Sequence, residues 1–366
     1  MKKSLLALAA MGAFVGTAHA QSSVTVYGVL DQSIGMFNNG SASSATNEPN
    51  ITANSANLIA TQRLGFRGTE DLGGGDRANF VIEGAFTTGA GINFQRAAYV
   101  EYAGKAWGSL SLGFRDLGTT NIDDLVSQAG NLGAMMTQAD GANITNTSGN
   151  GDGLGNDNAN AVVYTTPTIS GFSAEIGYKA PHTLAAATAG STAATGAASR
   201  AKDATTESQL GVRIDYTWKT LKVAIGQTRG DTTATSTATD RKLTAMGASY
   251  DFGVASVGYS RVIADASSTA KHTYNLFSAK VPVTKQIAIH GVYQNAKANT
   301  ANEEAAGFTF AVSQTLSKRS TIYAQYSALD NKGANAGYSM RGTGSATATG
   351  DTIDPKAFAV GFLHTF

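Results

Sequence analysis

The chain of 366 residues has no cysteine, only five prolines, and charged side chains at only 14% of its positions. The absence of cysteine excludes a disulfide framework and a thiolate metal site. Five histidines are present, never at the spacing of a metal-binding pair, so we expect neither a metal nor a cofactor. A formal net charge of +1 provides no basic surface for nucleic acid. Glycine is abundant, but hydrophobic residues make up 42% of the chain, which favours a folded protein over a disordered one.

The first twenty residues have the features of a secretion signal. Lys2 and Lys3 form a positive start, and residues 5–16 form an apolar stretch of 12 residues, which is too short to span a bilayer as a helix. Ala-His-Ala at 18–20 matches the small-x-small cleavage pattern. We therefore expect residues 1–20 to be removed as a signal peptide. Removing two of the 27 basic residues leaves 25 against 26 acidic ones, a net charge of −1.

The remainder, residues 21–366, is predicted to be a single domain made of β-strands. Apolar and polar residues alternate with a period of two, as in Leu-Gly-Val-Arg-Ile-Asp-Tyr at 210–216, which indicates strands with one apolar and one polar face. No segment in this domain reaches 18 consecutive apolar residues, so no transmembrane helix is expected. The pattern predicts sixteen strands, at 23–38, 57–70, 77–88, 93–103, 109–116, 161–166, 172–179, 207–217, 221–229, 242–252, 254–263, 272–281, 286–296, 304–316, 320–327 and 356–366.

The connections between these strands alternate between short and long. The short ones lie around 73–75, 104–105, 167–168, 219–220, 253, 282–283 and 317–318. The long, polar ones are 39–56, 89–92, 117–160, 180–206, 230–241, 264–271, 297–303 and 328–355. Antiparallel neighbours send alternate connections to opposite ends of a sheet, so one end is tight and the other is rich in loops, as in outer-membrane barrels. All five prolines fall outside strand interiors, as an uninterrupted hydrogen-bond ladder requires.

Alternation alone does not tell a soluble sandwich from a membrane barrel, in which the apolar face is turned outward. The low charge content favours the barrel, because a soluble surface usually carries about 25–35% charged residues. Aromatic residues near strand ends could form an interfacial girdle: Trp107, Tyr216, Trp218, Tyr250 and Phe252. The chain also ends in an amphipathic strand that closes with Phe366, a signature of outer-membrane proteins and an expected signal for the barrel-assembly machinery. We therefore predict an all-β, sixteen-stranded antiparallel transmembrane β-barrel in contact with outer-membrane lipid.

Several stretches resemble the general porins of Gram-negative bacteria, most of all those of β-proteobacteria. They are SSVTVYGVLD at 22–31, RLGFRGTEDLG at 63–73, RAAYV at 96–100, WG at 107–108, LGFR at 112–115 and VGFLHTF at 360–366. The resemblance implies an outer-membrane homotrimer whose sixteen-stranded barrels, with short periplasmic turns and long extracellular loops, pass small hydrophilic solutes and inorganic ions. In such porins the third long loop folds inward and narrows the channel, which implies the same role for residues 117–160.

The chemistry of this 44-residue connection suits a constriction. From Asp116 to Tyr178 there is no lysine or arginine, and the acidic candidates for the pore side are Asp116, Asp123, Asp124 and Asp140. The expected basic wall consists of Arg63, Arg67, Arg96 and Arg115. Arg63, Arg67 and Arg115 lie on the polar faces of their strands. Arg96 shares parity with the apolar face, so alternation allows it to point outward, but the resemblance places constriction arginines at both Arg63 and Arg96.

An arginine row facing carboxylates would create a transverse field that filters passive diffusion by size and charge. The arginines favour anions, although Gly-Asn-Asp-Asn at 155–158 lacks a basic residue found at this place in similar porins. Two other functions stay open. The barrel could be an adhesin or receptor with a plugged lumen and binding loops, or an outer-membrane lipase. The lipase needs a serine–histidine pair on the outer face, and the histidines at 182, 272, 290 and 364 offer no convincing one.

Overall fold

The computed structural model describes residues 23–38, 50–54, 58–87, 91–119, 122, 125, 136–138, 159–180, 208–232, 239–266, 271–299, 303–333, 338–340 and 354–366. Within these ranges, no helix has the length and apolarity needed to cross a bilayer. The predicted signal peptide lies outside the described residues.

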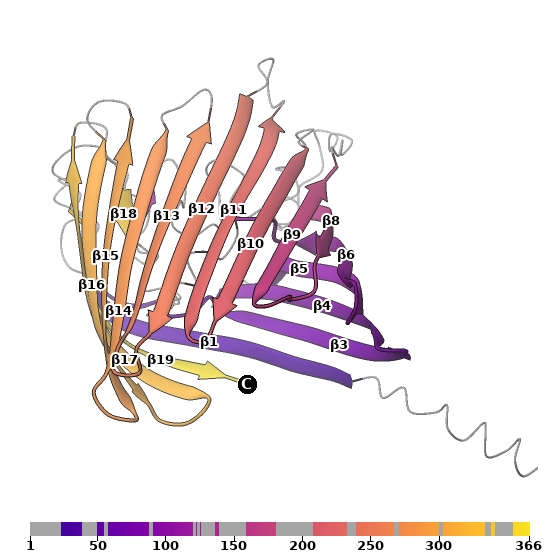
Figure 1. The fold of residues 1–366 in the computed structure, drawn as a ribbon. Helices are drawn as coiled ribbons and strands as arrows, with labels where there is room; N and C mark the ends of the chain where they lie inside the picture. The colour runs from indigo at the N-terminus through magenta and orange to yellow at the C-terminus, as the bar shows by residue number, and fades with distance from the viewer. Residues whose placement is uncertain are drawn as a thin grey trace, which may run out of the picture.

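The described part of the chain consists mainly of antiparallel strands that follow one another around a barrel (Figure 1). The strands are β1 (Ser23–Asn38), β2 (Asn50–Asn54), β3 (Arg63–Gly73), β4 (Asp76–Thr87), β5 (Gly91–Gly104), β6 (Gly108–Arg115), β7 (Met136–Gln138), β8 (Ala159–Thr165), β9 (Phe172–Lys179), β10 (Gln209–Trp218), β11 (Leu221–Thr232), β12 (Thr239–Asp251), β13 (Ser256–Ala266), β14 (His272–Pro282), β15 (Ile287–Ala298), β16 (Glu304–Thr315), β17 (Ser320–Lys332), β18 (Tyr338–Met340) and β19 (Lys356–Thr365).

Sixteen long strands form a closed wall. In order around the barrel they are β1, β3, β4, β5, β6, β8, β9, β10, β11, β12, β13, β14, β15, β16, β17 and β19. Residues 23–29 of β1 pair with β3, and residues 29–38 pair with β19, which closes the cylinder. The short strands β7 and β18 pair only with each other. The predicted sixteen-stranded antiparallel barrel is confirmed.

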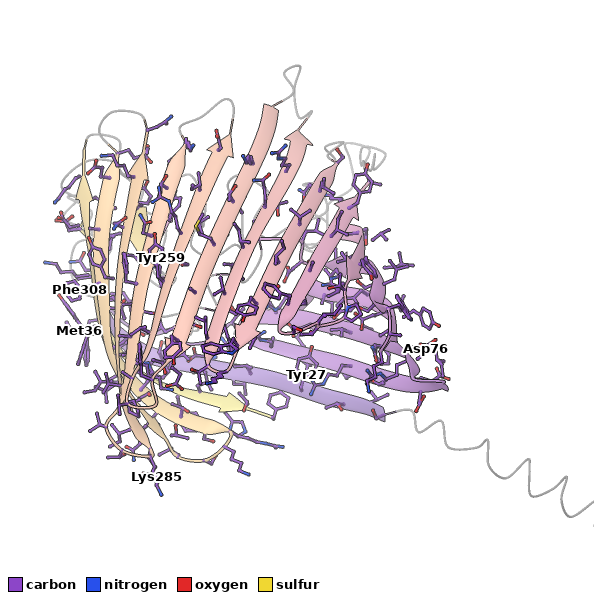
Figure 2. All side chains as sticks on the ribbon, in the orientation of Figure 1. Tyr27, Met36, Asp76, Tyr259, Lys285 and Phe308 are labelled. Carbon is purple, nitrogen blue, oxygen red and sulfur yellow. The ribbon has the colours of Figure 1, made fainter. Side chains whose placement is uncertain are left out.

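The apolar face of the wall points outward, as predicted. Val100 on β5 and Phe308 on β16 are 59% and 51% exposed, and Figure 2 shows Phe308 and Met36 directed away from the barrel. Tyr259, Phe277, Tyr293 and Phe308 occupy one register row on this outer face across β13 to β16. The alternate positions of these strands are small, polar or buried and line the inside.

The short connections are tight turns, one of which contains the labelled Lys285 (Figure 2). In the β3–β4 turn Gly73, Gly74 and Gly75 all have positive φ, and Lys219 in the β10–β11 turn has φ 52°. Glycine adopts this left-handed conformation without the steric cost that a side chain imposes. The predicted short turns at one end of the barrel therefore agree with the described structure.

The prediction of a continuous strand over 57–70 was wrong at its beginning. β3 starts at Arg63, and the separate strand β2 pairs with β1 at residues 33–37. At Ile59 and Ala60 the backbone N–H groups donate to the Asp31 carboxylate instead of to a neighbouring strand, at 2.7 and 2.9 Å. A side chain from another strand thus replaces the ladder, which local alternation does not reveal.

The C-terminal residue pairs with the first strand where the barrel closes. The N–H of Gly28 donates to the carbonyl of Phe366 and the N–H of Phe366 donates to the carbonyl of Gly28, both at 3.1 Å. The Phe366 ring covers Gly28 so closely that a Cβ at position 28 would lie 2.3 Å from the ring and 2.7 Å from the carbonyl oxygen of Arg63. Only glycine fits at this closure point.

Candidate functional site

Two arginines from neighbouring strands converge on one glutamate on the inner wall. Arg96 Nε of β5 lies 2.6 Å from Glu83 Oε1 of β4, and Arg63 Nη1 of β3 lies 3.8 Å from the same oxygen. The Tyr27 hydroxyl of β1 donates to Glu83 Oε2 at 2.9 Å. We call Tyr27, Arg63, Glu83 and Arg96 the first charge cluster. It brings together four strands at one place in the lumen.

Arg96 reaches the lumen because the β4–β5 ladder is irregular beside it. Glu83 pairs with Ala97 and Ala85 pairs with Asn93, so β5 advances four residues while β4 advances two. Such a bulge redirects side chains relative to regular alternation. The outward position allowed by parity is therefore wrong for Arg96, and the structure brings it to the same carboxylate as Arg63.

The first charge cluster is positive and presents its cations to the lumen. Two guanidinium groups against one carboxylate give a formal charge of +1. The side chains of Arg63 and Arg96 are 31% and 28% exposed, whereas that of Glu83 is 13% exposed. A solute in the channel would therefore meet guanidinium groups more readily than the carboxylate.

Arg67 extends the positive wall along β3. It is exposed, it shares the inner face with Arg63, and its guanidinium carbon lies 5.3 Å from the centroid of the Tyr27 ring. A cation at this distance from a ring is attracted by the ring quadrupole. Tyr27 in turn lies across Gly65, where a Cβ would be 2.3 Å from the ring. Gly65 thus makes room for the aromatic side chain that contacts both Arg67 and Glu83.

A second charge cluster lies farther around the wall and consists of Arg115, Glu175, Arg213 and Asp215. Arg115 Nη2 lies 2.8 Å from Glu175 Oε2, and Arg213 Nη2 lies 2.7 Å from Asp215 Oδ1. Arg213 and Glu175 are also register partners on β10 and β9. Two guanidinium groups and two carboxylates leave this cluster formally neutral. Arg213, which was not among the predicted constriction residues, belongs to it.

The beginning of the connection 117–160 packs against the inner wall. Leu117 and Gly118 lie on the glycines of β9 to β11: a Cβ at Gly177 would be 2.4 Å from Leu117 Cδ2, and one at Gly211 would be 3.0 Å from Gly118 N. Farther along, Ile122 is fully buried. The backbone can approach the wall this closely because glycine has no side chain. The described root of the third loop thus lies inside the barrel.

A buried hydroxyl pair fastens this root. The Thr119 and Thr228 hydroxyl oxygens are 3.0 Å apart, and the Thr119 N–H points to the Thr228 oxygen at 3.4 Å. Both residues are fully buried.

Replacing Thr228 with valine should loosen the root of the loop. The substitution keeps the shape but leaves Thr119 with less hydrogen bonding in a buried place, at a cost of about 1–3 kcal/mol. We expect faster cleavage within 117–160 by thermolysin, which suits a segment without lysine or arginine, with the sites mapped by mass spectrometry. Thr244→Val is the matched control, because the Thr244 hydroxyl contacts Gln227 on the outer face. Equal cleavage rates for both variants would contradict the anchoring role.

The predicted acidic side of the constriction is only partly covered by the structure. Asp116 is half-buried and follows Arg115 directly. Asp123, Asp124 and Asp140 lie outside the described residues. Sequence reasoning missed Glu83 and Glu175, which are the carboxylates that contact the predicted arginines. Their positions on the polar faces of β4 and β9 could have identified them.

Within the described part of the chain, no three His, Cys, Asp or Glu side chains come together in a way that could hold a metal ion. The arrangement therefore offers fixed charges in a lumen and a loop root folded into it. Such an interior can attract, orient or repel ions that pass through.

Comparison with known proteins identifies the family. A family model described as Gram-negative porin matches residues 7–335. Outer membrane porin protein 32 of Delftia acidovorans is 30% identical over 347 residues, which cover 92% of this chain and 91% of that protein. Among solved structures, an anion-selective porin from Comamonas acidovorans has a TM-score of 0.74 at 24% identity and covers 94% of this chain and 100% of that one. OmpT of Vibrio cholerae, in a trimer form, has a TM-score of 0.63 at 15% identity, with coverages of 94% and 99%.

These matches agree with the closed barrel, its outward apolar face and its charged interior. A barrel of sixteen strands is too wide for its own side chains to fill, so it encloses water. The chain therefore belongs to the Gram-negative porin family and forms a water-filled channel in the outer membrane for the passive diffusion of small hydrophilic solutes and ions.

Proposed function

We propose that the first charge cluster, together with Arg67, is the basic side of the channel constriction and gives the porin a weak preference for anions. The observation that carries this proposal is the pair of guanidinium groups on the carboxylate of Glu83, with the cations more exposed than the anion. One unit charge at about 6 Å from an ion in water contributes about 0.7 kcal/mol. That is a factor of about three in local ion concentration before salt screening.

The preference is weak because the second charge cluster is formally neutral. Arg115 and Arg213 each pair with a carboxylate. The second charge cluster can therefore orient a polar solute but adds little net charge to the channel. The solved porin named anion-selective supports the same sign of selectivity. A polar solute that crosses such a wall can align its dipole, whereas an apolar one must disturb ordered water.

We propose that residues 117–160 supply the opposite, acidic side and narrow the channel. The support is the packing of Leu117 and Gly118 on the wall glycines, together with the absence of any basic residue from Asp116 to Tyr178. Asp116, Asp123, Asp124 and Asp140 are the proposed acidic residues. A loop rooted inside the barrel has enough length to cross part of the lumen.

We further propose that residues 1–20 direct export and that the mature chain assembles as a homotrimer, for which the trimer form of the similar OmpT is the support. The terminal strand with Phe366 would be recognised by the barrel-assembly machinery, and the outward apolar face would contact outer-membrane lipid. We infer that the protein acts as a channel and not as an enzyme. Its membership of a channel family does not favour a plugged adhesin or receptor.

The proposal is tested by recording single channels of the purified protein in a planar bilayer. We expect large, stable current steps that occur in threes, and a reversal potential in a salt gradient with the sign of anion preference. Low or absent conductance would favour the receptor alternative. A reversal potential with the sign of cation preference would contradict the proposed role of the first charge cluster.

Replacing Glu83 with glutamine should strengthen anion selectivity. The change raises the formal charge of the first cluster from +1 to +2 and preserves the size of the side chain. We expect the anion-to-cation permeability ratio from the reversal potential to rise about threefold or more. Glu304→Gln is the control, because Glu304 is exposed on the outer face, where it pairs with Lys297. A ratio unchanged by Glu83→Gln would remove Glu83 from the ion path.

A further inference from the structure

The wall next to β1 is formed by β2 and β3 in turn, and it is interrupted between them. The described residues of this interruption lie on the inner side of the barrel. Asn54 of β2 pairs with Ser33, and Arg63 of β3 pairs with Val29. On β1 only three residues separate these partners, while eight residues separate Asn54 from Arg63. The segment between these two pairs is therefore five residues longer than the ladder needs. We call residues 58–62, the described part of this segment, the strand break.

The strand break lies on the inner side of β1, where Asp31 holds it. Asp31 is almost fully buried, and its Oδ2 accepts hydrogen bonds from the N–H groups of Ile59 and Ala60 at 2.7 and 2.9 Å. Its other oxygen accepts a hydrogen bond from the Tyr323 hydroxyl of β17 at 2.7 Å. All of these groups are donors, so they stabilise a buried carboxylate in its charged form. Burying a charge is costly unless it is paired in this way.

Apolar packing supports the same placement. Leu58 is fully buried and belongs to the large interior hydrophobic cluster, whose members come from β1 and β11 to β19 and include Phe37, Tyr323 and Ile122 of the third loop. Ile59 packs against the same cluster. Tyr323 can reach across because it lies over Gly361, where a Cβ would be 2.2 Å from the ring. The strand break is thus held by packing as well as by the carboxylate.

The strand break leads directly into the first charge cluster. The carbonyl of Thr61 accepts a hydrogen bond from Arg63 Nε at 3.2 Å, which leaves Arg63 Nη1 directed at Glu83. A continuous physical connection therefore runs from Tyr323 through Asp31 and the backbone of the strand break to the Arg63 guanidinium. Displacement of the break would move the carbonyl that fixes this arginine.

The strand break also lies across the lumen from the root of the third loop. In the closed order of sixteen wall strands, β11 is eight steps from β1 in either direction. The loop root packs on glycines of β9, β10 and β11, whereas the strand break is hydrogen-bonded to Asp31 of β1, which also accepts a hydrogen bond from Tyr323 of β17. The two inward elements therefore approach the channel from opposite sides.

We propose that the strand break is a second element of the constriction, opposite the third loop, and that Asp31 is a positioning residue that holds this element and, through Thr61, the selectivity arginine Arg63. This inference rests on the proposed role of Arg63 in ion selectivity and adds a residue that does not contact the solute. Asp31 would determine where the positive charge stands and how wide the channel is beside it.

The placement of the break is tested by single cysteines, which the cysteine-free chain makes possible. Ala60→Cys and Thr61→Cys each add one thiol, and a methanethiosulfonate reagent is applied during single-channel recording. We expect modification to reduce the current through at least one of the two variants, because the added group enters the lumen. Gly291→Cys is the control, since position 291 has open space on the outer wall. Unchanged current after modification of both variants, verified by mass spectrometry, would overturn the inward placement.

The positioning role of Asp31 is tested by a double-mutant cycle with Asp31→Asn and Arg63→Ala. Reversal potentials are measured for the parent, both single variants and the double variant. If Asp31 acts through Arg63, Asp31→Asn changes selectivity less in the Arg63→Ala chain than in the parent. An equal change in both backgrounds would show that Asp31 acts only through its own charge or through general stability, and would refute the positioning role.

The outcomes remain separable. If Asp31→Asn does not fold, Tyr323→Phe replaces it in the cycle, because it removes one hydrogen bond to Asp31 and keeps the ring over Gly361. Cysteine modification could reduce the current while the Arg63→Ala, Arg96→Ala double variant keeps the parent's selectivity. That result would contradict the role of the arginines in selectivity and would still support the strand break as a second element of the constriction. The reverse pattern would contradict the second element alone.

Discussion

Replacing Arg63 and Arg96 together with alanine is expected to lower the anion-to-cation permeability ratio about tenfold and to give the channel cation selectivity. The double change converts the formal charge of the first cluster from +1 to −1, because Glu83 remains without its guanidinium partners. Two unit charges at about 6 Å change the energy of a passing ion by about 1.4 kcal/mol, with opposite signs for anions and cations, and salt screening lowers the combined effect on their ratio to a factor of about ten. The reversal potential in a salt gradient measures this ratio directly.

The control removes the same net charge at another place. Lys318→Ala with Arg319→Ala changes two exposed cations in the short turn between β16 and β17. Those charges lie at the barrel end, where salt screens them, so we expect only a small change in the reversal potential. A small change from the Arg63 and Arg96 pair as well would show that both arginines lie outside the selectivity region.

Replacing Gly28 with valine is expected to prevent most of the protein from closing its barrel. The new side chain would meet the Phe366 ring and the carbonyl of Arg63, and the latter belongs to the backbone of β3 and cannot rotate away. Overpacking of a tight site typically costs about 1–3 kcal/mol, and here it acts where the first and last strands join. The folded fraction is measured by the heat-modifiable mobility of the barrel in detergent electrophoresis and by circular dichroism.

Gly291→Val is the matched control for this closure test. Position 291 lies within β15, and a Cβ built there has no atom within 4 Å. The folded yield should match that of the parent. When the denatured chains are refolded in detergent, without the barrel-assembly machinery, adding Phe366→Ala to Gly28→Val should recover only part of the yield, because it removes the ring clash and leaves the clash with the Arg63 carbonyl. A normal folded yield of Gly28→Val alone would contradict the closure described at Phe366.

Alternation was sufficient to predict the strands of the wall, because every strand in a membrane barrel turns one face to lipid and the other to the lumen. β1 and β9 have the predicted boundaries, at 23–38 and 172–179. Both strands place apolar side chains at most of their outward positions, so their local sequences contain most of the signal. The short turns were predictable for a related reason, since glycines such as Gly74 allow the positive φ that these turns require.

Alternation was insufficient where residues far apart in the sequence decide the local structure. The strand break at 58–62 depends on Asp31, 28 positions away in one hydrogen bond and 29 in the other. The direction of Arg96 depends on a register change between β4 and β5. Neither can be read from the period of a single segment, because a carboxylate or a bulge elsewhere supplies the cause.

The interior charges were predicted only in part. Arg63 and Arg96 came from the resemblance to porins, and the structure unites them on Glu83. The carboxylate itself was sought in the connection 117–160, where acidic residues are frequent in the sequence. Charge content drew attention to that loop, whereas the parity of Glu83 on β4 would have pointed to the wall. Face assignment is therefore a better guide to lumen chemistry than local charge density.

The central claim is that the first charge cluster holds a positive field in the ion path. Crystals of the purified porin soaked in bromide and, separately, in rubidium test it most directly, because anomalous scattering locates each ion. The account predicts bromide beside the guanidinium groups of Arg63 and Arg96, and no rubidium there. Rubidium at these guanidinium groups, with bromide elsewhere in the lumen, would contradict it.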